Sequence, residues 1–290
     1  MKAMKNLYIK PWLYTVFAMV LVSSCTDVVD VELEDETPNL VIEGSLDWSI
    51  DENGTLDGSE QTITLSMSTP YFSQDEVTNV TGASVVVTND STGETYIFQD
   101  QNDGTYYTNT FEPVENQTFT LHVEYDGETY EGSDTFLPGS LIEYYGQSTM
   151  GGFDSDLIEI NFYIQDDATL ENFYLEKFYR HGDLLNSIET FSDEFVNGNL
   201  INDFYEISDD DDDDIEPLQP GDVVDIYLYS ITENYFNYMM ILLNQSEATG
   251  NPFASIPVAL QGNCKNISGG KDAYGYFRTT QVHKITYTVL

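Results

Sequence analysis

One cysteine stands where bacterial lipoproteins receive their covalent lipid. Cys25 follows a lysine-containing start, an apolar stretch over Trp12–Val22 and two serines. That stretch has the length of a signal peptide and is too short to span a bilayer. The match to a lipobox is loose, because Val22 takes the place where leucine is usual and Leu21 lies one residue further back. We expect residues 1–24 to be a lipoprotein signal peptide, and Cys25 to carry the lipid that is the only anchor. The alternative is an ordinary secreted protein that is cleaved near Ser24.

Acidic side chains offer two candidate cation sites. The better-spaced oxygens, in a loop that contains glycine, are those of Asp47, Asp51, Asn53 and Asp57. Carboxylate and amide oxygens are ligands that Ca²⁺ prefers, although Leu56 occupies the place where an EF-hand has its glycine. The second candidate is the run Asp209–Asp214, whose more usual role is a solvated loop. Calcium is the only cofactor that the sequence suggests.

No catalytic constellation accompanies these acids. The sequence lacks the nucleophile-elbow, zinc-protease, P-loop and dinucleotide motifs, and its three histidines are scattered without zinc-ligand spacing. If Cys25 is lipidated, Cys264 is a lone thiol, and we interpret it as a small buried hydrophobe. We therefore predict a protein that binds and is not an enzyme.

Composition narrows the class of partner. The chain has 51 acidic and nine basic residues, a net charge of −42, and three of the basic residues precede Cys25. Such a surface repels nucleic acid and anionic lipid headgroups and attracts cations and basic partners. Aromatic residues make up 13% of the chain, which supplies ample material for a core.

The element pattern predicts a mostly β protein in two domains. Residues 25–37 form an acidic tether, and residues 38–139 contain short alternating segments typical of an immunoglobulin-like β-sandwich. Turn segments such as Asn89–Gly93, Asn102–Gly104 and Asp126–Gly127 favour the left-handed backbone of tight hairpins. Residues 140–290 are expected to form a second β-rich domain whose strands include one over 184–191. It should also contain one helix at about 231–247, which Thr232 could cap, and a final strand over 283–290.

Adjacent aromatic pairs mark the strands of the second domain. They are Phe162–Tyr163, Phe173–Tyr174, Phe178–Tyr179 and Phe204–Tyr205. Neighbours on a strand point to opposite faces, so Tyr163, Tyr174 and Tyr179 could form an outward platform for a partner. The alternative is that the helix or the first domain covers the second face, which makes both faces core.

The order of several short motifs resembles one known family. Cys25 is followed by "PNLVIEG", "TPYF", "GASVVV" and "GTY", and later by "NPFASIP", "GN" and "GYF". This series resembles a Bacteroidetes lipoprotein family, domain of unknown function family 4249. The resemblance implies an outer-membrane lipoprotein, possible surface exposure, and a gene that often lies beside that of a TonB-dependent receptor. It assigns no functional residues.

Two functional hypotheses follow from these features. The first is a ligand- or partner-binding accessory of a TonB-dependent uptake receptor. The second is a structural or adhesive surface lipoprotein without a transport role. An exposed aromatic groove near the domain junction would favour the first, and smooth acidic faces would favour the second.

The lipid anchor is directly testable. Cys25→Ala should abolish incorporation of labelled palmitate and release the protein from the membrane fraction, because the thiol that receives the lipid is removed. Unchanged membrane retention of both the wild-type protein and the variant, with no label in either, would contradict the lipoprotein assignment.

Overall fold

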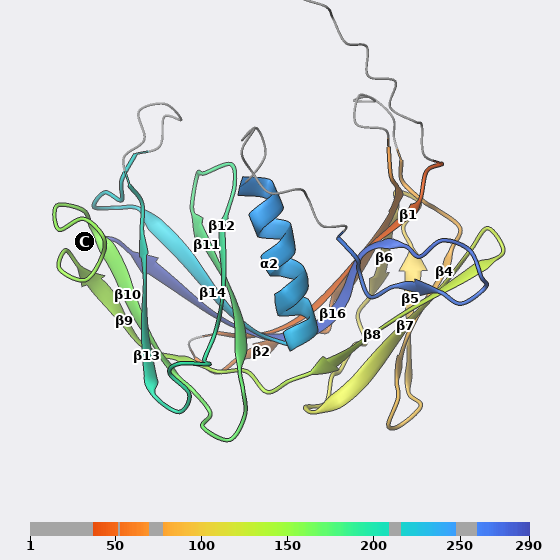
Figure 1. Cartoon of the computed structure of the whole chain (residues 1–290), viewed down its shortest axis with the longest axis horizontal. Helices are drawn as coiled ribbons and strands as arrows, with labels where there is room; N and C mark the ends of the chain where they lie inside the picture. Colours follow the sequence, from red (N-terminus) through yellow and green to blue (C-terminus); the bar gives the residue numbers. More distant parts are fainter. Residues whose placement is uncertain (1–36, 52, 70–77, 209–215, 248–259) are drawn as a thin grey trace, which may run out of the picture. The chain divides into compact units, whose positions relative to one another are not determined.

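The computed structural model describes residues 37–51, 53–69, 78–208, 216–247 and 260–290 (Figure 1). Cys25, most of the predicted tether and the run Asp209–Asp214 lie outside the described residues. From Pro38 to Leu290 the chain forms one compact unit.

Strands dominate the first half of this unit. They are β1 (Leu40–Asp51), β2 (Leu56–Asp57), β3 (Gln61–Met67), β4 (Ser84–Asn89), β5 (Thr95–Asp100), β6 (Thr105–Thr108), β7 (Gln117–Tyr125) and β8 (Glu128–Phe136). The hairpin turns have the expected left-handed residues, with positive φ at Asn102 and Asp126. Alternation sets the buried face of each strand, as in β7, where Phe119, Leu121 and Val123 are all fully buried.

The second half adds strands and a helix. They are β9 (Ile142–Ser148), β10 (Glu159–Gln165), β11 (Phe173–Arg180), β12 (Ser187–Ser192), β13 (Leu200–Glu206), β14 (Val223–Ile231), α2 (Glu233–Glu247), β15 (Lys265–Asn266) and β16 (Tyr274–Thr288). The mostly β fold class with one helix in the second half is confirmed for the described residues. None of their helices is both long and apolar enough to span a bilayer.

A single large sheet passes through both halves. Its strand order is β12-β11-β14-β16-β1-β3-β6-β5-β4-β7-β8-β15, with β2 paired to β1, and a separate three-stranded sheet has the order β13-β10-β9. The first and last long strands, β1 and β16, pair in parallel from Val41 opposite Tyr274 to Asp51 opposite Lys284. The two predicted domains therefore share these central strands.

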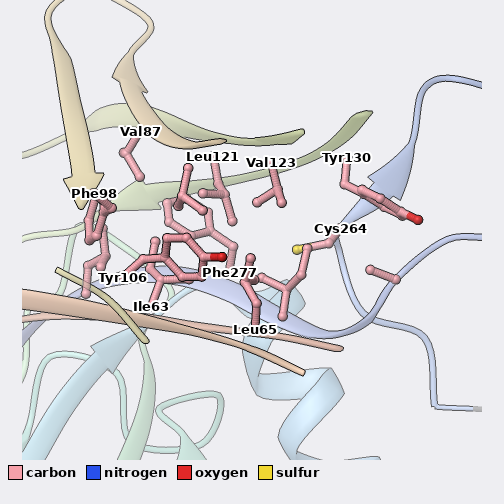
Figure 2. Close-up of a cluster of buried hydrophobic side chains, with 14 of the residues drawn as sticks. Ile63, Leu65, Val87, Phe98, Tyr106, Leu121, Val123, Tyr130, Cys264 and Phe277 are labelled. Carbon is pink, nitrogen blue, oxygen red and sulfur yellow. The ribbon is translucent and has the colours of Figure 1, made fainter. Parts of the chain in front are cut away.

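The first core lies inside the folded sheet of the first half. Strands β1, β3, β5 and β6 contribute one set of its side chains, and β4, β7 and β8 contribute another. Figure 2 shows Cys264 among these side chains, with Phe277 of β16 close by in the same cluster. Burial raises the pKa of the Cys264 thiol to about 12. The interpretation of Cys264 as a buried hydrophobe is confirmed.

The second half has a core on each face of the large sheet. One core lies between β11, β14 and β16 and the three-stranded sheet, and includes Tyr174 and Phe178. The other lies on the opposite face, where Leu175 and Tyr229 pack with Tyr235 and Met239 of α2. Helix α2 contacts β11 and β12 (Figure 1). Both faces of this part of the sheet are therefore core.

Three predicted elements have different limits in the structure. The final strand begins at Tyr274, nine residues before the expected start at His283. The strand expected to begin at Leu184 begins at Ser187, so Leu184 and Leu185 belong to the preceding turn. The helix begins at Glu233, directly after Thr232, whose hydroxyl donates to the Asp134 carboxylate at 2.9 Å.

The pairing of β1 with β16 places a steric demand on Gly275. Its φ is +85°, and a Cβ at this position would collide with the carbonyl oxygen of Ile42. Gly269 also has a positive φ, +97°, but a Cβ there would meet nothing within 4 Å. A substitution at Gly269 therefore tests backbone strain alone, whereas the same substitution at Gly275 tests backbone strain together with the collision.

We expect Gly269→Ala to lower the free energy of unfolding by about 1–2 kcal/mol, the cost of a left-handed alanine. Gly275→Ala should lower it by at least twice that amount, because β1 must also move away from β16. Urea denaturation of both variants measures the difference. Equal losses would show that the Ile42 carbonyl does not constrain this position.

Candidate functional site

The structure does not gather the predicted calcium ligands around one point. Asp47 lies in β1, and its carboxylate is bound by the Arg278 guanidinium through two contacts of 2.6 and 3.2 Å. Asp51 accepts hydrogen bonds from the backbone N–H groups of Asn53 and Thr55, which close a turn. The hydrogen bond from Thr55 holds the pKa of Asp51 below its usual range. Asp57 is exposed on β2.

A broader search gives the same result for the described ranges. There, no group of three or more histidine, cysteine, aspartate or glutamate side chains is arranged to hold a metal ion. Asp47 and Asp51 instead have structural partners within the protein.

The Asp47–Arg278 pair is the main ionic contact beneath α2. Arg278 is fully buried, with its guanidinium carbon 5.0 Å from the Tyr229 ring centre and 5.2 Å from that of Tyr235. Aromatic faces stabilise a buried cation, and Asp47 supplies the opposite charge. This arrangement explains how an arginine is accommodated between a helix and a sheet.

The predicted tyrosine platform is wrong at its central residue. Tyr174 is 0% exposed, and its hydroxyl donates to the Asp166 carboxylate at 2.7 Å. Tyr163 and Tyr179 are half-buried on different sheets, the first on β10 and the second on β11. The three-stranded sheet covers the face of β11 that bears Tyr174, so these tyrosines do not share one outward surface.

Exposed hydrophobic side chains gather elsewhere, at one end of the second half. Six large hydrophobic side chains in the described part of the chain are at least 80% exposed. Five of them form a set that we name the apolar end: Met150, Phe153, Leu184, Leu185 and Leu290. Large apolar side chains exposed together at one end of a protein are candidates for an interaction surface.

Strand register places these five residues at the same end. Ser148 and Glu206 both pair with Glu159, so the β9–β10 loop, with Met150 and Phe153, lies at that end of the three-stranded sheet. In the large sheet Arg180 pairs with Val224, and the preceding residue of β14, Val223, pairs with Thr288. Two hydrogen bonds between Gln147 and the backbone of Leu290, 2.7 and 3.2 Å long, join the two ends.

A buried carboxylate fixes the loop that bears Met150 and Phe153. Glu159 is fully buried and accepts the N–H of Gly151 at 2.6 Å, together with that of Gly152. Burial raises its pKa, but hydrogen bonds from Asn161 and Gly151 outweigh burial, so the pKa lies below its usual value. The Phe153 ring packs on Phe204 with centres 5.2 Å apart. The loop is therefore built to hold its apolar tip in place.

The hairpin that bears Leu184 and Leu185 is also anchored. The Arg180 guanidinium contacts the Asp183 carboxylate at 3.0 Å and donates to the Glu216 carbonyl at 2.7 Å. These contacts fix the base of the turn and leave the two leucines in solvent. The signal in the sequence was the pair Leu184–Leu185 between turn residues, which we had assigned to a strand.

Comparison with known families gives one match. The profile of Domain of unknown function (DUF4249) matches residues 26–286. The chain belongs to the DUF4249 family. The match confirms the predicted domain family. No curated protein sequence matches this DUF4249 protein.

Solved structures show only distant likeness. One is a cytokine receptor complex with 7% identity and a TM-score of 0.24, and the match covers 68% of this chain and 87% of that chain. Another is a DUF4785 family protein from Legionella pneumophila with 13% identity and a TM-score of 0.24, and the match covers 66% of this chain and 51% of that chain. The chicken CNTN1 FN1–FN3 domains are a third (11% identity, 69% and 62%, TM-score 0.23). This chain spans less than two thirds of the second and third structures. TM-scores this low do not establish a shared fold.

The role of Asp47 in this DUF4249 protein can be tested by stability. Asp47→Asn should lower the free energy of unfolding by about 3 kcal/mol, because it leaves the buried Arg278 without a counter-charge. Asp47→Asn combined with Arg278→Met should recover most of that loss, since no buried charge remains.

Asp57→Asn is the matched control, because Asp57 is exposed and should leave stability nearly unchanged. Urea denaturation in the presence of EDTA removes any contribution from a bound metal. A loss for Asp47→Asn that appears only with added calcium would contradict the ion-pair role and favour the metal site.

Proposed function

We propose that this DUF4249 protein is an outer-membrane lipoprotein that binds a partner without catalysis, as an accessory of a TonB-dependent uptake receptor. The observation that carries the proposal is the apolar end, where two anchored loops present large hydrophobic side chains to solvent. Large apolar anchors surrounded by polar residues are typical of partner-binding surfaces.

The charges around the apolar end favour a protein partner over the lipid surface. The β9–β10 loop also contains Asp154 and Asp156, and the hairpin contains Asp183. Anionic headgroups repel such a set of carboxylates, so insertion of these loops into a membrane surface is disfavoured. A receptor with basic or neutral loops can instead contact both the apolar and the acidic groups.

The compact unit begins at the end of β16 that is remote from the apolar end. The chain enters the compact unit at Pro38, just before β1, and β1 begins beside Tyr274, the first residue of β16. The apolar end lies beside Thr288, the last residue of that strand. Fifteen residues of strand span roughly 50 Å. Pro38 and the apolar end therefore lie near opposite ends of β16.

Anchoring in the same membrane strengthens even a weak contact. When two proteins are confined to one surface, the effective concentration of each for the other is high. A small apolar surface is then sufficient for association with a receptor, although the same surface would bind weakly in dilute solution.

The experiment is co-purification from membranes under mild detergent. Phe153→Ser and the double variant Leu184→Ser, Leu185→Ser should each reduce recovery of a TonB-dependent receptor, because truncating a central apolar anchor costs about 2 kcal/mol of binding. Thermal stability should change little, since these side chains lie in solvent.

Phe195→Ser is the matched control. Phe195 is 89% exposed but lies in the β12–β13 loop, at the opposite end of the second half. Recovery of the receptor with this variant should equal that of the wild type. If the wild-type lipoprotein recovers no receptor, the accessory role fails and the structural or adhesive alternative takes its place.

A further inference from the structure

Two loops bring buried oxygen atoms together at the end of the second half remote from the apolar end. Asp166 follows β10, Asn172 precedes β11 and Asp193 follows β12. The Asp193 N–H donates to the Asn172 carbonyl at 3.1 Å, which ties the β10–β11 and β12–β13 loops together. Gly198 donates its N–H to the Asp166 carboxylate at 2.7 Å and strengthens the same junction.

The two carboxyl groups at this junction are buried and adjoin each other. Asp166 is 4% exposed and Asp193 is 0% exposed. Burial raises the pKa of Asp193, the backbone N–H of Asn172 lowers it in part, and the neighbouring Asp166 carboxylate raises it again, so that the pKa lies above its usual value. Two like charges in contact, both removed from water, are unfavourable unless something compensates them.

No basic side chain supplies that compensation. Among the described residues, no lysine, arginine or histidine forms an ion pair with either aspartate. Neither Asp193 oxygen has a described donor in good hydrogen-bond geometry, and the same is true of the buried Oδ1 of Asn172. The Asn172 N–H acts on the Asp193 carboxylate from outside that geometry. Three oxygen atoms on two loops are therefore free to bind a ligand that carries positive charge.

A pocket reaches this junction at Asp166 and Asn172, whereas Asp193 is not among its lining residues. It has a volume of about 540 Å³ and is lined by Asp166 and Asn172 as well as by Glu143, Asp167 and Glu171. The three additional carboxylates make its entrance strongly negative and attract cations. Water in the pocket can complete a coordination sphere.

We propose that the Asp166 and Asp193 carboxylates and the side-chain carbonyl of Asn172 form a calcium site. Ca²⁺ takes six to eight hard oxygen ligands, which combine carboxylates, amide carbonyls and water in flexible geometry. Tyr174 and Gly198 already donate to Asp166, but each carboxylate oxygen keeps a second lone pair for a metal. The site contains only two carboxylates, so it differs from a cluster of three or more acidic groups.

This site is separate from the apolar end and from the calcium ligands expected from the sequence. The bound ion would hold the β10–β11 loop and the β12–β13 loop together. Its consequence is therefore a fold whose stability depends on calcium, whether or not the partner-binding role holds.

The test uses the full-length lipoprotein, purified in mild detergent, stripped with EDTA and titrated with calcium chloride at constant ionic strength. Calorimetry should show saturable binding, and at hundredfold excess over Kd the Tm should rise by roughly 5–10 °C. An equal concentration of magnesium should give a much smaller shift, because Mg²⁺ requires stricter geometry and dehydrates reluctantly.

The variants separate loss of a ligand from loss of the fold. Asp193→Asn and Asp166→Asn should each weaken calcium binding at least tenfold, yet Asp193→Asn should melt no lower than the wild type in EDTA, because the repulsion is relieved. Asp57→Asn, the charge-matched control at the site expected from the sequence, should bind calcium as the wild type does.

Three results would overturn the proposal. The first is an equal Tm shift with calcium and magnesium, which indicates general screening of the acidic surface. The second is loss of the calcium shift in Asp57→Asn but not in Asp193→Asn. The third is a Tm that does not change with calcium concentration but changes with pH in the wild type and not in Asp193→Asn. That result indicates that the two aspartates share a proton.

Discussion

The parallel pairing of β1 with β16 is the constraint on which the rest of the fold depends. These strands are separated by almost the whole described chain, yet each contributes to the first core, and β16 also contributes to both cores of the second half. Parallel strands in this position are covered on both faces, and residues 276–283 of β16 are all buried. Neither half can complete its core until the two strands meet. Such long-range pairing is slow to form, because the entropy of closing a long loop is lost before the contacts are gained.

The elements that local patterns determine were predictable, and those that depend on distant partners were not. Alternation identified β7, because each buried residue of this strand is followed by an outward one. The Asn, Asp and Gly residues between strands identified the tight turns. The first half of β16 was missed because Arg278, Gln281 and His283 look unsuited to a buried strand. Their partners lie far away in sequence: Arg278 binds Asp47, Gln281 accepts the Gly139 N–H, and His283 Nδ1 accepts the Ile142 N–H. No local window contains this information.

The same limit applies to the predicted sites. Spacing along the chain grouped Asp47 with Asp51, but β1 extends between them and Asp47 meets a residue 231 positions later. Tyr174 was assigned to an outward face because the sequence does not show that a second sheet covers it. Leu184 and Leu185 were read as strand residues, although the β11–β12 turn places them in solvent. A residue's type was therefore informative, whereas its exposure depended on tertiary packing.

Scarcity of basic residues determines how this protein accommodates its buried acids. Arg278 neutralises Asp47, and Lys284 with His181 contacts Asp225. Backbone N–H groups serve Glu159 and Asp134, the latter through Thr279 at 3.0 Å. Two buried carboxyls, those of Glu176 and Asp193, have no basic partner among the described residues and have oxygens without a donor in good hydrogen-bond geometry. Glu176 is buried beside Glu189 and Asp203, and burial, followed by those charges, raises its pKa well above the usual value. Asp193 differs because its neighbour Asp166 lines a pocket open to ions. The chain has 51 acidic and nine basic residues. At a site of this kind, a cation from solution neutralises the buried carboxylates, a role that lysine or arginine has at the other sites.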